Sequence, residues 1–121
     1  PLVGPSSILL ALIASGANGQ NFSFNGYLPV TRPERIKALK VFEKQSAVEN
    51  RTQLFIETPY RNLQLFEDII SALSPTTRLT IACDITTENE YIKTMSIKDW
   101  KHVKPDINKR PAIFVLYARS F

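Results

Sequence analysis

The apolar residues near the start of the chain predict a buried helix. Residues 8–13 are apolar throughout, so every side of a helix formed by them would avoid water, which is typical of a deeply buried helix. Ser6 and Ser7 precede this run and can cap the free amides at its start, and Ser15-Gly16 provides a stop. The preceding Val3-Gly4-Pro5 is expected to be the sharply turning end of a strand.

A capping-box pattern predicts a second helix over about residues 32–49. Thr31 is its expected N-cap, Glu34 stands three residues further on, and Pro33 lies in the first turn. The apolar positions of this segment then recur at helical spacing, and we expect them to face the core. They are Ile36, Leu39 and Phe42.

A third helix is predicted to begin at Thr58, as N-cap, with Pro59 in the first helical position. Its apolar residues fall on one face, which is expected to pack on the sheet. The pair Ser74-Pro75 ends the helix. The apolar residues are Leu63, Phe66, Ile69, Ile70 and Leu73.

Short apolar or alternating segments between these helices predict strands. A short helix through Trp100 is expected to start at Ser96 or Asp99. Because helices and strands alternate along most of the chain, we predict an α/β fold with a mixed, mostly parallel sheet flanked by helices. Residues 91–96 should form an antiparallel or edge strand and residues 112–117 a central one. The other predicted strands are residues 22–25, 54–56 and 79–83.

Composition places the chain among globular proteins of one domain. It has 121 residues, of which 44% are hydrophobic and 21% charged. No apolar run reaches the roughly 18 residues of a membrane span. One cysteine, Cys83, and one histidine, His102, allow no internal disulfide, fit a cytoplasmic protein and argue against a Cys/His metal site. The net charge of +4 is compatible with an RNA partner.

Three sequence segments carry a resemblance to a known family. Pro1-Leu-Val-Gly-Pro-Ser-Ser7 comes first, Leu54-Phe-Ile-Glu-Thr-Pro-Tyr-Arg61 second and Ala82-Cys-Asp-Ile-Thr-Thr87 third. In order and spacing they resemble the tetrapyrrole methylase superfamily, the class III methyltransferases that use S-adenosylmethionine. The second segment is similar to the Glu-Ser-Pro-His-Arg turn of the branch that 2′-O-methylates a cytidine ribose in 16S ribosomal RNA. The third stands where that branch has Arg-Glu-Leu-Thr-Lys.

The resemblance implies a domain organisation and a cofactor. Members of the family carry an N-terminal α/β domain before the region matched here, so residues 1–121 would be the C-terminal domain of a class III methyltransferase. The methyl donor lies in the cleft between the two domains. Members are usually homodimers, and this half by itself would be inactive or nearly so. No catalytic base can be assigned from the sequence.

The resemblance also implies which residues contact the methyl donor, mostly through main-chain hydrogen bonds to adenine and ribose. Each of these residues also has a plain structural alternative: the two serines could only cap the helix, and the acidic residue could be a turn carboxylate. The implied cofactor-binding residues are Ser6, Ser7, Glu57, Ile85, Pro111 and Ala112.

Basic residues are the candidates for contact with the substrate. Lys37, Lys40 and Lys44 are spaced by three and four residues, so they share one side of a helix. This side is either a solvated surface or a contact for RNA phosphates. Arg61 could bind a phosphate through its planar guanidinium or form an ion pair with Glu57 or Glu67.

Two departures from the RNA-modifying branch keep other functions open. Tyr60 replaces a histidine, and Asp84-Ile-Thr86 lacks the basic residue of the branch pattern. The first alternative is therefore a methylase of a tetrapyrrole or another small molecule. The second is a basic RNA-binding module without catalytic activity.

Overall fold

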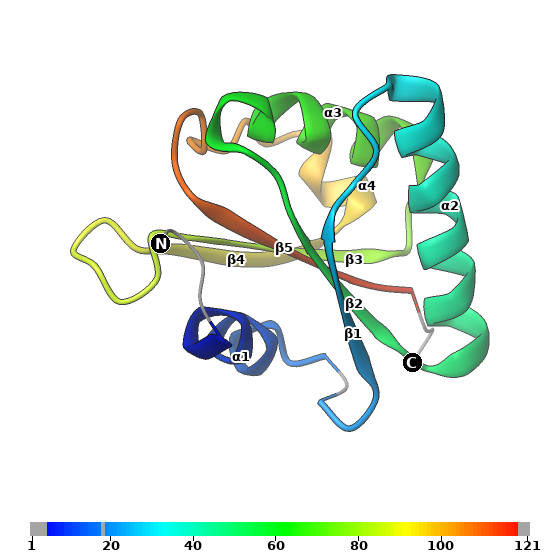
Figure 1. Cartoon of the computed structure of the whole chain (residues 1–121), viewed down its shortest axis with the longest axis horizontal. Helices are drawn as coiled ribbons and strands as arrows, with labels where there is room; N and C mark the ends of the chain where they lie inside the picture. Colours follow the sequence, from blue (N-terminus) through cyan, green and yellow to red (C-terminus); the bar gives the residue numbers. More distant parts are fainter. Residues whose placement is uncertain (1–4, 18, 119–121) are drawn as a thin grey trace.

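A computed structural model describes residues 5–17 and 19–118, which form one five-stranded sheet with helices on both faces (Figure 1). The expected strand end at Val3-Gly4 lies outside the described residues. The spatial order of the strands is β1-β2-β5-β3-β4. Their bounds are Phe22–Tyr27 (β1), Thr52–Ile56 (β2), Arg78–Cys83 (β3), Tyr91–Ser96 (β4) and Ala112–Tyr117 (β5).

The predicted mixed sheet flanked by helices is confirmed, but the expectation that it is mostly parallel is wrong. Only β1 and β2 pair in parallel, and the other three pairings are antiparallel. The alternation of helices and strands does make β1, β2 and β3 run in one direction. However, β5 inserts between β2 and β3 and runs opposite to both. As predicted, β5 is central and β4 is an antiparallel edge strand.

The helices cover the two faces of the sheet unequally. Helix α1 (Pro5–Ser15) lies alone on one face, whereas α2 (Arg32–Glu49), α3 (Asn62–Ala72) and α4 (Ile97–Trp100) cover the other (Figure 1). A 3-10 turn at Pro59–Arg61 leads into α3. The larger core therefore lies between the sheet and α2–α4, where Trp100 donates a hydrogen bond from Nε1 to the Leu79 carbonyl at 2.8 Å.

Helix α1 is not buried on all sides, which corrects the prediction from its apolar run. Ala11 and Leu12 pack against the sheet, but Leu9, Leu10 and Ile13 are 53%, 40% and 67% exposed. A helix lying on a sheet buries only the face that it turns toward the strands. No other described element covers the outer side of α1, so the apolar residues on that side stay exposed.

The predicted caps of the next two helices are only partly correct. Helix α2 begins at Arg32 with Pro33 in its first turn, but the Thr31 side chain makes no capping hydrogen bond. The Thr31 carbonyl instead accepts from the Arg35 amide at 2.9 Å. Pro59 opens the next helical segment as expected, again without a side-chain bond from Thr58. Backbone geometry, rather than a capping box, therefore starts both segments.

Arg35, which stands among the lysines of α2 in the sequence, is buried and fixes α2 to α3. Its side chain is 2% exposed, and Nε donates to Oδ2 of Asp68 at 2.7 Å. Nη1 donates to the Val30 carbonyl at 2.7 Å, and Arg32 Nε donates to the second Asp68 oxygen at 3.0 Å. Burying a charge is tolerated only where such partners compensate its lost hydration.

Replacing Asp68 by alanine should lower the free energy of unfolding by about 3–5 kcal/mol, because the Arg35 charge would stay buried without its carboxylate. Urea unfolding followed by circular dichroism measures the change. The matched control is Glu67→Ala on the exposed side of the same helix, which should alter stability by no more than about 0.5 kcal/mol. Equal losses for the two variants would contradict the assigned role of the buried pair.

Candidate functional site

Four of the predicted cofactor-binding residues meet at one end of the sheet. Because β5 runs opposite to its neighbours, its first residue, Ala112, pairs with Cys83 at the end of β3, and Ile113 pairs with Ile56 at the end of β2. Three segments therefore lie side by side here: residues 57–62, 84–90 and 106–112. We call this the loop end of the sheet. It contains Glu57, Ile85, Pro111 and Ala112.

The first turn of α1, with the two predicted serines, lies toward the same end. Ser15 and the residues after it line a small cavity with Thr80 and Tyr117, at the opposite end of the sheet. Ile8 packs in the cluster that contains Ile56 and Ile85. The helix therefore runs away from the loop end. Ser6 and Ser7 are its second and third residues, so they lie inside its first turn and not at the N-cap position predicted for them; Ser6 is exposed and Ser7 half-buried.

Glu57 is a buried acid with a basic neighbour. It is 6% exposed, and its Oε1 accepts a hydrogen bond from the Thr58 amide at 2.7 Å. Arg61 Nε lies 3.4 Å from the same oxygen, whereas Glu67 is exposed on α3. The expected ion pair of Arg61 is thus with Glu57, and any phosphate bound by Arg61 would share it with this carboxylate.

Arg110 joins the segments of the loop end and was missed as an individual residue by the sequence reasoning. Its Nε donates to Oδ2 of Asp84 at 2.7 Å, and its Nη1 donates to the Asp106 carbonyl at 2.6 Å. Nη2 donates to the Asn89 carbonyl. The hydrogen bond with Asp84 raises the pKa of Arg110 above its ordinary value. The two residues stand 26 positions apart, so no local spacing signalled the pair.

Three non-glycine residues in these loops adopt left-handed backbone angles, with positive φ. Asp84 has φ 50°, Thr86 has φ 70° and Lys109 has φ 61°. Such angles are uncommon for residues other than glycine, above all for β-branched ones such as threonine. Each costs about 1–3 kcal/mol and persists only where the surroundings impose it, often at functional sites. The loop end is therefore held in its shape by contacts.

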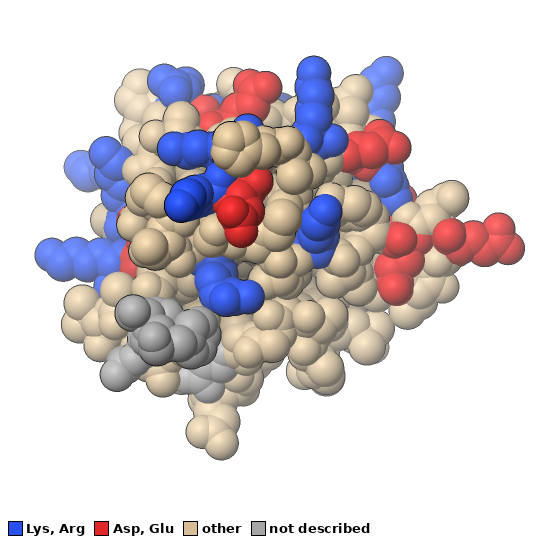
Figure 2. Space-filling model, turned by 180° about the vertical axis from the view of Figure 1, so that it is seen from behind, with Lys and Arg blue, Asp and Glu red and all other residues tan. Residues whose placement is uncertain are grey.

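The basic candidates for substrate contact do not gather in one place. Lys37, Lys40 and Lys44 are exposed along α2, which starts near the loop end and leads away from it, while Arg61 lies at the loop end itself. On the face seen in Figure 2, Lys and Arg side chains are spread out with Asp and Glu between them. The lysines therefore form a row on one helix rather than part of a continuous basic pocket.

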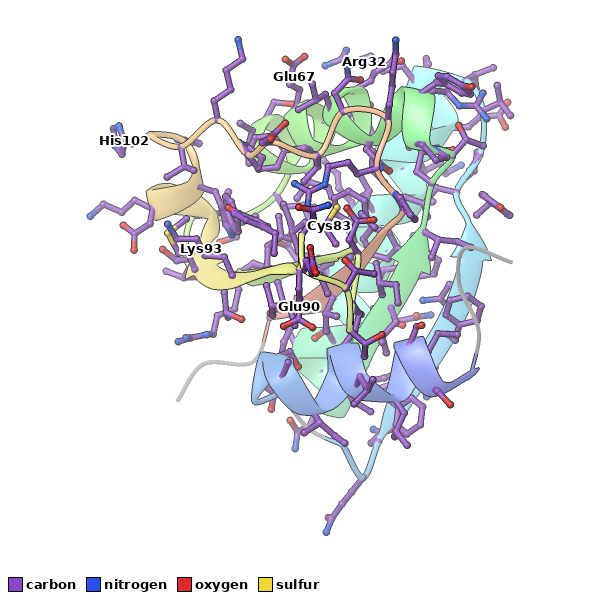
Figure 3. All side chains as sticks on the ribbon, turned by 90° about the vertical axis from the view of Figure 1, so that its left-hand side faces the viewer. Arg32, Glu67, Cys83, Glu90, Lys93 and His102 are labelled. Carbon is purple, nitrogen blue, oxygen red and sulfur yellow. The ribbon has the colours of Figure 1, made fainter. Side chains whose placement is uncertain are left out.

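Cys83 is a core thiol at the loop end. Figure 3 views the molecule from this end, with Cys83 and Glu90 between α1 and the helices of the other face. Burial raises the pKa of Cys83 to about 11, although Arg110 opposes the shift. Burial also raises the pKa of Tyr91. A neutral, buried thiol of this kind packs as a small apolar group and is a poor nucleophile.

Residues 5–17 and 19–118 contain no group of three or more His, Cys, Asp or Glu side chains that could hold a metal ion. Over the same residues, no helix is both long and apolar enough to cross a membrane.

The fold is shared with solved structures of methyltransferases that have the tetrapyrrole methylase fold. The solved structure of the cobalt precorrin-4 methyltransferase CbiF aligns with 92% of this chain and 48% of its own, with a TM-score of 0.59 and 17% identity. The methyltransferase CobJ aligns with 91% of this chain and 52% of its own, with a TM-score of 0.53 and 17% identity. At this identity, the likeness shows the fold alone.

Sequence comparison identifies the relatives. No protein-family model matches the chain. The ribosomal RNA small subunit methyltransferase I of Escherichia coli O157:H7 is 34% identical over 119 residues, which cover 96% of this chain and 40% of that protein. The protein of the same name from Vibrio cholerae is 30% identical, covering 100% of this chain and 41% of its own length.

The chain is thus homologous to part of ribosomal RNA small subunit methyltransferase I, a tetrapyrrole methylase family protein, and the resemblance stated from the motifs is confirmed. It spans about two fifths of the length of these relatives. Proteins of this family use S-adenosylmethionine as methyl donor.

The buried thiol gives a direct test of the geometry at the loop end. Burial raises the pKa of Cys83 to about 11 and shields its sulfur from reagents, so the thiol is almost wholly protonated near pH 8. An unperturbed cysteine is roughly a quarter thiolate at that pH. Iodoacetamide should therefore alkylate the native chain more than about 100-fold more slowly than the same chain in urea. Intact-mass spectrometry follows the reaction, and comparable rates in both states would contradict the described burial.

Proposed function

We propose that the chain is the C-terminal domain of an S-adenosylmethionine-dependent methyltransferase that 2′-O-methylates a ribose in ribosomal RNA. The loop end would form one side of the donor site, and the rest of the protein would form the other side. One observation carries the proposal: in a chain homologous to such enzymes, six residues from four distant segments meet at one end of the sheet.

The residues at the loop end fit the polar groups of the donor. The Glu57 carboxylate is fixed through Oε1, and no described residue is hydrogen-bonded to its Oε2, which can therefore accept from ribose hydroxyls. The loop after β3 at Ile85 and the start of β5 at Ala112 can offer main-chain groups to adenine. Both lie at the end of the sheet where β2 and β3 finish, and carboxyl ends of strands are the usual place for ligands in α/β sheets. Ser6 and Ser7 add hydroxyls at the start of α1.

The donor supplies an electrophilic methyl group, which passes from its sulfonium to the ribose oxygen while that hydroxyl loses its proton. The contribution of this chain is to position the donor, which can supply a large part of the acceleration of an in-line displacement. The carboxylates of Glu57 and Asp84 at the loop end are paired with Arg61 and Arg110, so we assign neither of them as the base for that proton. We therefore propose that the chain binds the donor weakly and is inactive by itself.

The proposal can be tested by an amide-resolved NMR titration of the chain with S-adenosylhomocysteine. The expected shifts gather at the loop end and at the start of α1, because bound ligand changes the surroundings of these amides. Shifts confined to α2 or to the opposite end of the sheet would contradict the site. Unchanged spectra at millimolar ligand would contradict a donor half-site in this domain. The amides to follow are Ser6, Ser7, Glu57, Ile85 and Ala112.

A small-molecule methylase is the second candidate, supported by the fold shared with a cobalt precorrin-4 methyltransferase. The same donor site would then serve a different acceptor. Methyl transfer by the complete protein to small ribosomal subunits, compared with transfer to a precorrin, separates the two. Activity on the precorrin alone would exclude the RNA assignment.

RNA contact along α2 is proposed from its exposed row of lysines, which also supports the third candidate, an RNA-binding module without catalysis. Charge reversal of Lys37, Lys40 and Lys44 to Glu should weaken RNA binding. The salt dependence of the binding constant should fall by roughly 2 in slope, since each lost phosphate contact removes about 0.7 on single strands. Fluorescence anisotropy at several salt concentrations measures both quantities.

The matched control reverses three exposed lysines elsewhere on the domain, Lys98, Lys101 and Lys104. Both triple variants change the net charge equally, so a larger loss for the α2 variant identifies a local contact. Equal losses would mean that only overall charge matters and that α2 is a solvated surface. Binding of RNA with no response to S-adenosylhomocysteine would favour the module without catalysis.

The proposal also covers the oligomeric state and the cellular location of the protein. We propose a homodimer, supported by exposed apolar residues on α1 such as Ile13, at 67%, and on β1 such as Phe24, at 43%. Monomeric proteins rarely expose large contiguous apolar surface without a partner. Sedimentation equilibrium tests this assembly. We also propose a cytoplasmic location, because a ribosomal RNA substrate fits it.

A further inference from the structure

We propose that Arg110 is a positioning residue that locks the three segments of the loop end into the arrangement that binds the methyl donor. This inference rests on the proposed function and goes beyond it. It assigns a role to a residue that touches no predicted donor contact through its side chain.

The Arg110 side chain ties the 84–90 loop to the 106–112 segment. Its guanidinium reaches the Asp84 carboxylate at 2.7 Å, at the start of that loop, and the Asn89 carbonyl, near the loop's end. Nη1 simultaneously donates to the Asp106 carbonyl at 2.6 Å. The guanidinium therefore spans the mouth of the loop that carries Ile85.

The main chain beside Arg110 extends the same connection to residues 57–62. The Asn62 side chain, which is fully buried, donates from Nδ2 to the Arg110 carbonyl. The Lys109 amide donates to the Pro59 carbonyl at 3.0 Å. On the other side, the Asp84 amide donates to the Pro111 carbonyl at 3.2 Å. Arg110 thus stands at the point where all three segments are joined.

The backbone of these loops needs such a lock. Asp84 and Thr86 hold positive φ angles of 50° and 70° on either side of Ile85, and Lys109, directly before Arg110, holds 61°. Without external contacts, these residues would relax toward ordinary angles and move the main-chain groups at Ile85 and Ala112. The Glu90 carboxylate supports Thr86 by accepting from its amide at 2.8 Å, a contact within the 84–90 loop.

Only arginine can make this connection at position 110. Its planar guanidinium presents five N–H donors in a fixed fork, whereas lysine offers a point charge without a preferred plane. The partly buried ion pair, with Arg110 and Asp84 each 21% exposed, is also less screened than a pair at the open surface. A lysine at this position keeps the charge but cannot bond to Asp84, Asn89 and Asp106 together.

The test compares the parent chain with Arg110→Gln and Arg110→Lys by NMR, using S-adenosylhomocysteine as the probe. Both substitutions should weaken binding about tenfold or more, since small displacements of positioning groups are costly. Hydrogen exchange of the Asp84, Thr87 and Glu90 amides should accelerate in both variants. Failure of lysine to restore affinity shows that geometry, not charge, is what Arg110 supplies.

The matched control is Arg51→Gln, which removes the ion pair with Glu49 at the opposite end of the sheet and should leave binding unchanged. If the Arg110 variants do not fold, Asp84→Ala breaks the same contact from the loop side. Folded variants that bind like the parent overturn this inference alone. A parent chain that does not bind the probe overturns the proposed donor site as well.

Discussion

The position of β5 between β2 and β3 is the constraint on which the candidate site depends. Because β5 runs opposite to both neighbours, its first residues meet the last residues of each. Ala112 therefore lies beside Cys83, while the following residue pairs with Ile56. If β5 were an edge strand, it would have one neighbouring strand, and its first residues would lie beside the end of that strand alone. The central antiparallel strand thus brings segments 26 and 48 residues apart in sequence together at the loop end.

Helices cover the two faces of the sheet to different extents. Helices α2, α3 and α4 bury one face around Trp100 and Phe55, whose side chains are wholly removed from water. Within residues 5–17 and 19–118, the other face carries only α1, and apolar residues remain exposed on its outer side and on β1. The complete face supplies the rigid support of the loop end. The incomplete face is the surface that the proposed partner subunit would cover.

Two arginine–aspartate pairs stabilise the structure at different depths, one in the core and one near the surface. Arg35 and Asp68 are both almost fully buried and join α2 to α3 beneath the surface. Arg110 and Asp84 are partly exposed and join loops. The first pair fixes the position of two helices, whereas the second constrains a backbone that would otherwise relax. The same chemistry therefore serves stability in the core and geometry at the proposed site.

The sequence alone determined the helices and strands, since apolar periodicity and residues such as Pro33 and Pro59 act within a few neighbours. Its motifs also predicted the segments of the candidate site, and the i,i+4 spacing of Glu57 and Arg61 allowed their ion pair to be anticipated. Only the tertiary structure decided that β5 separates β2 from β3, that Arg35 is buried, and that the outer side of α1 is not. These outcomes depend on which distant segments pack together, and no local pattern records that choice.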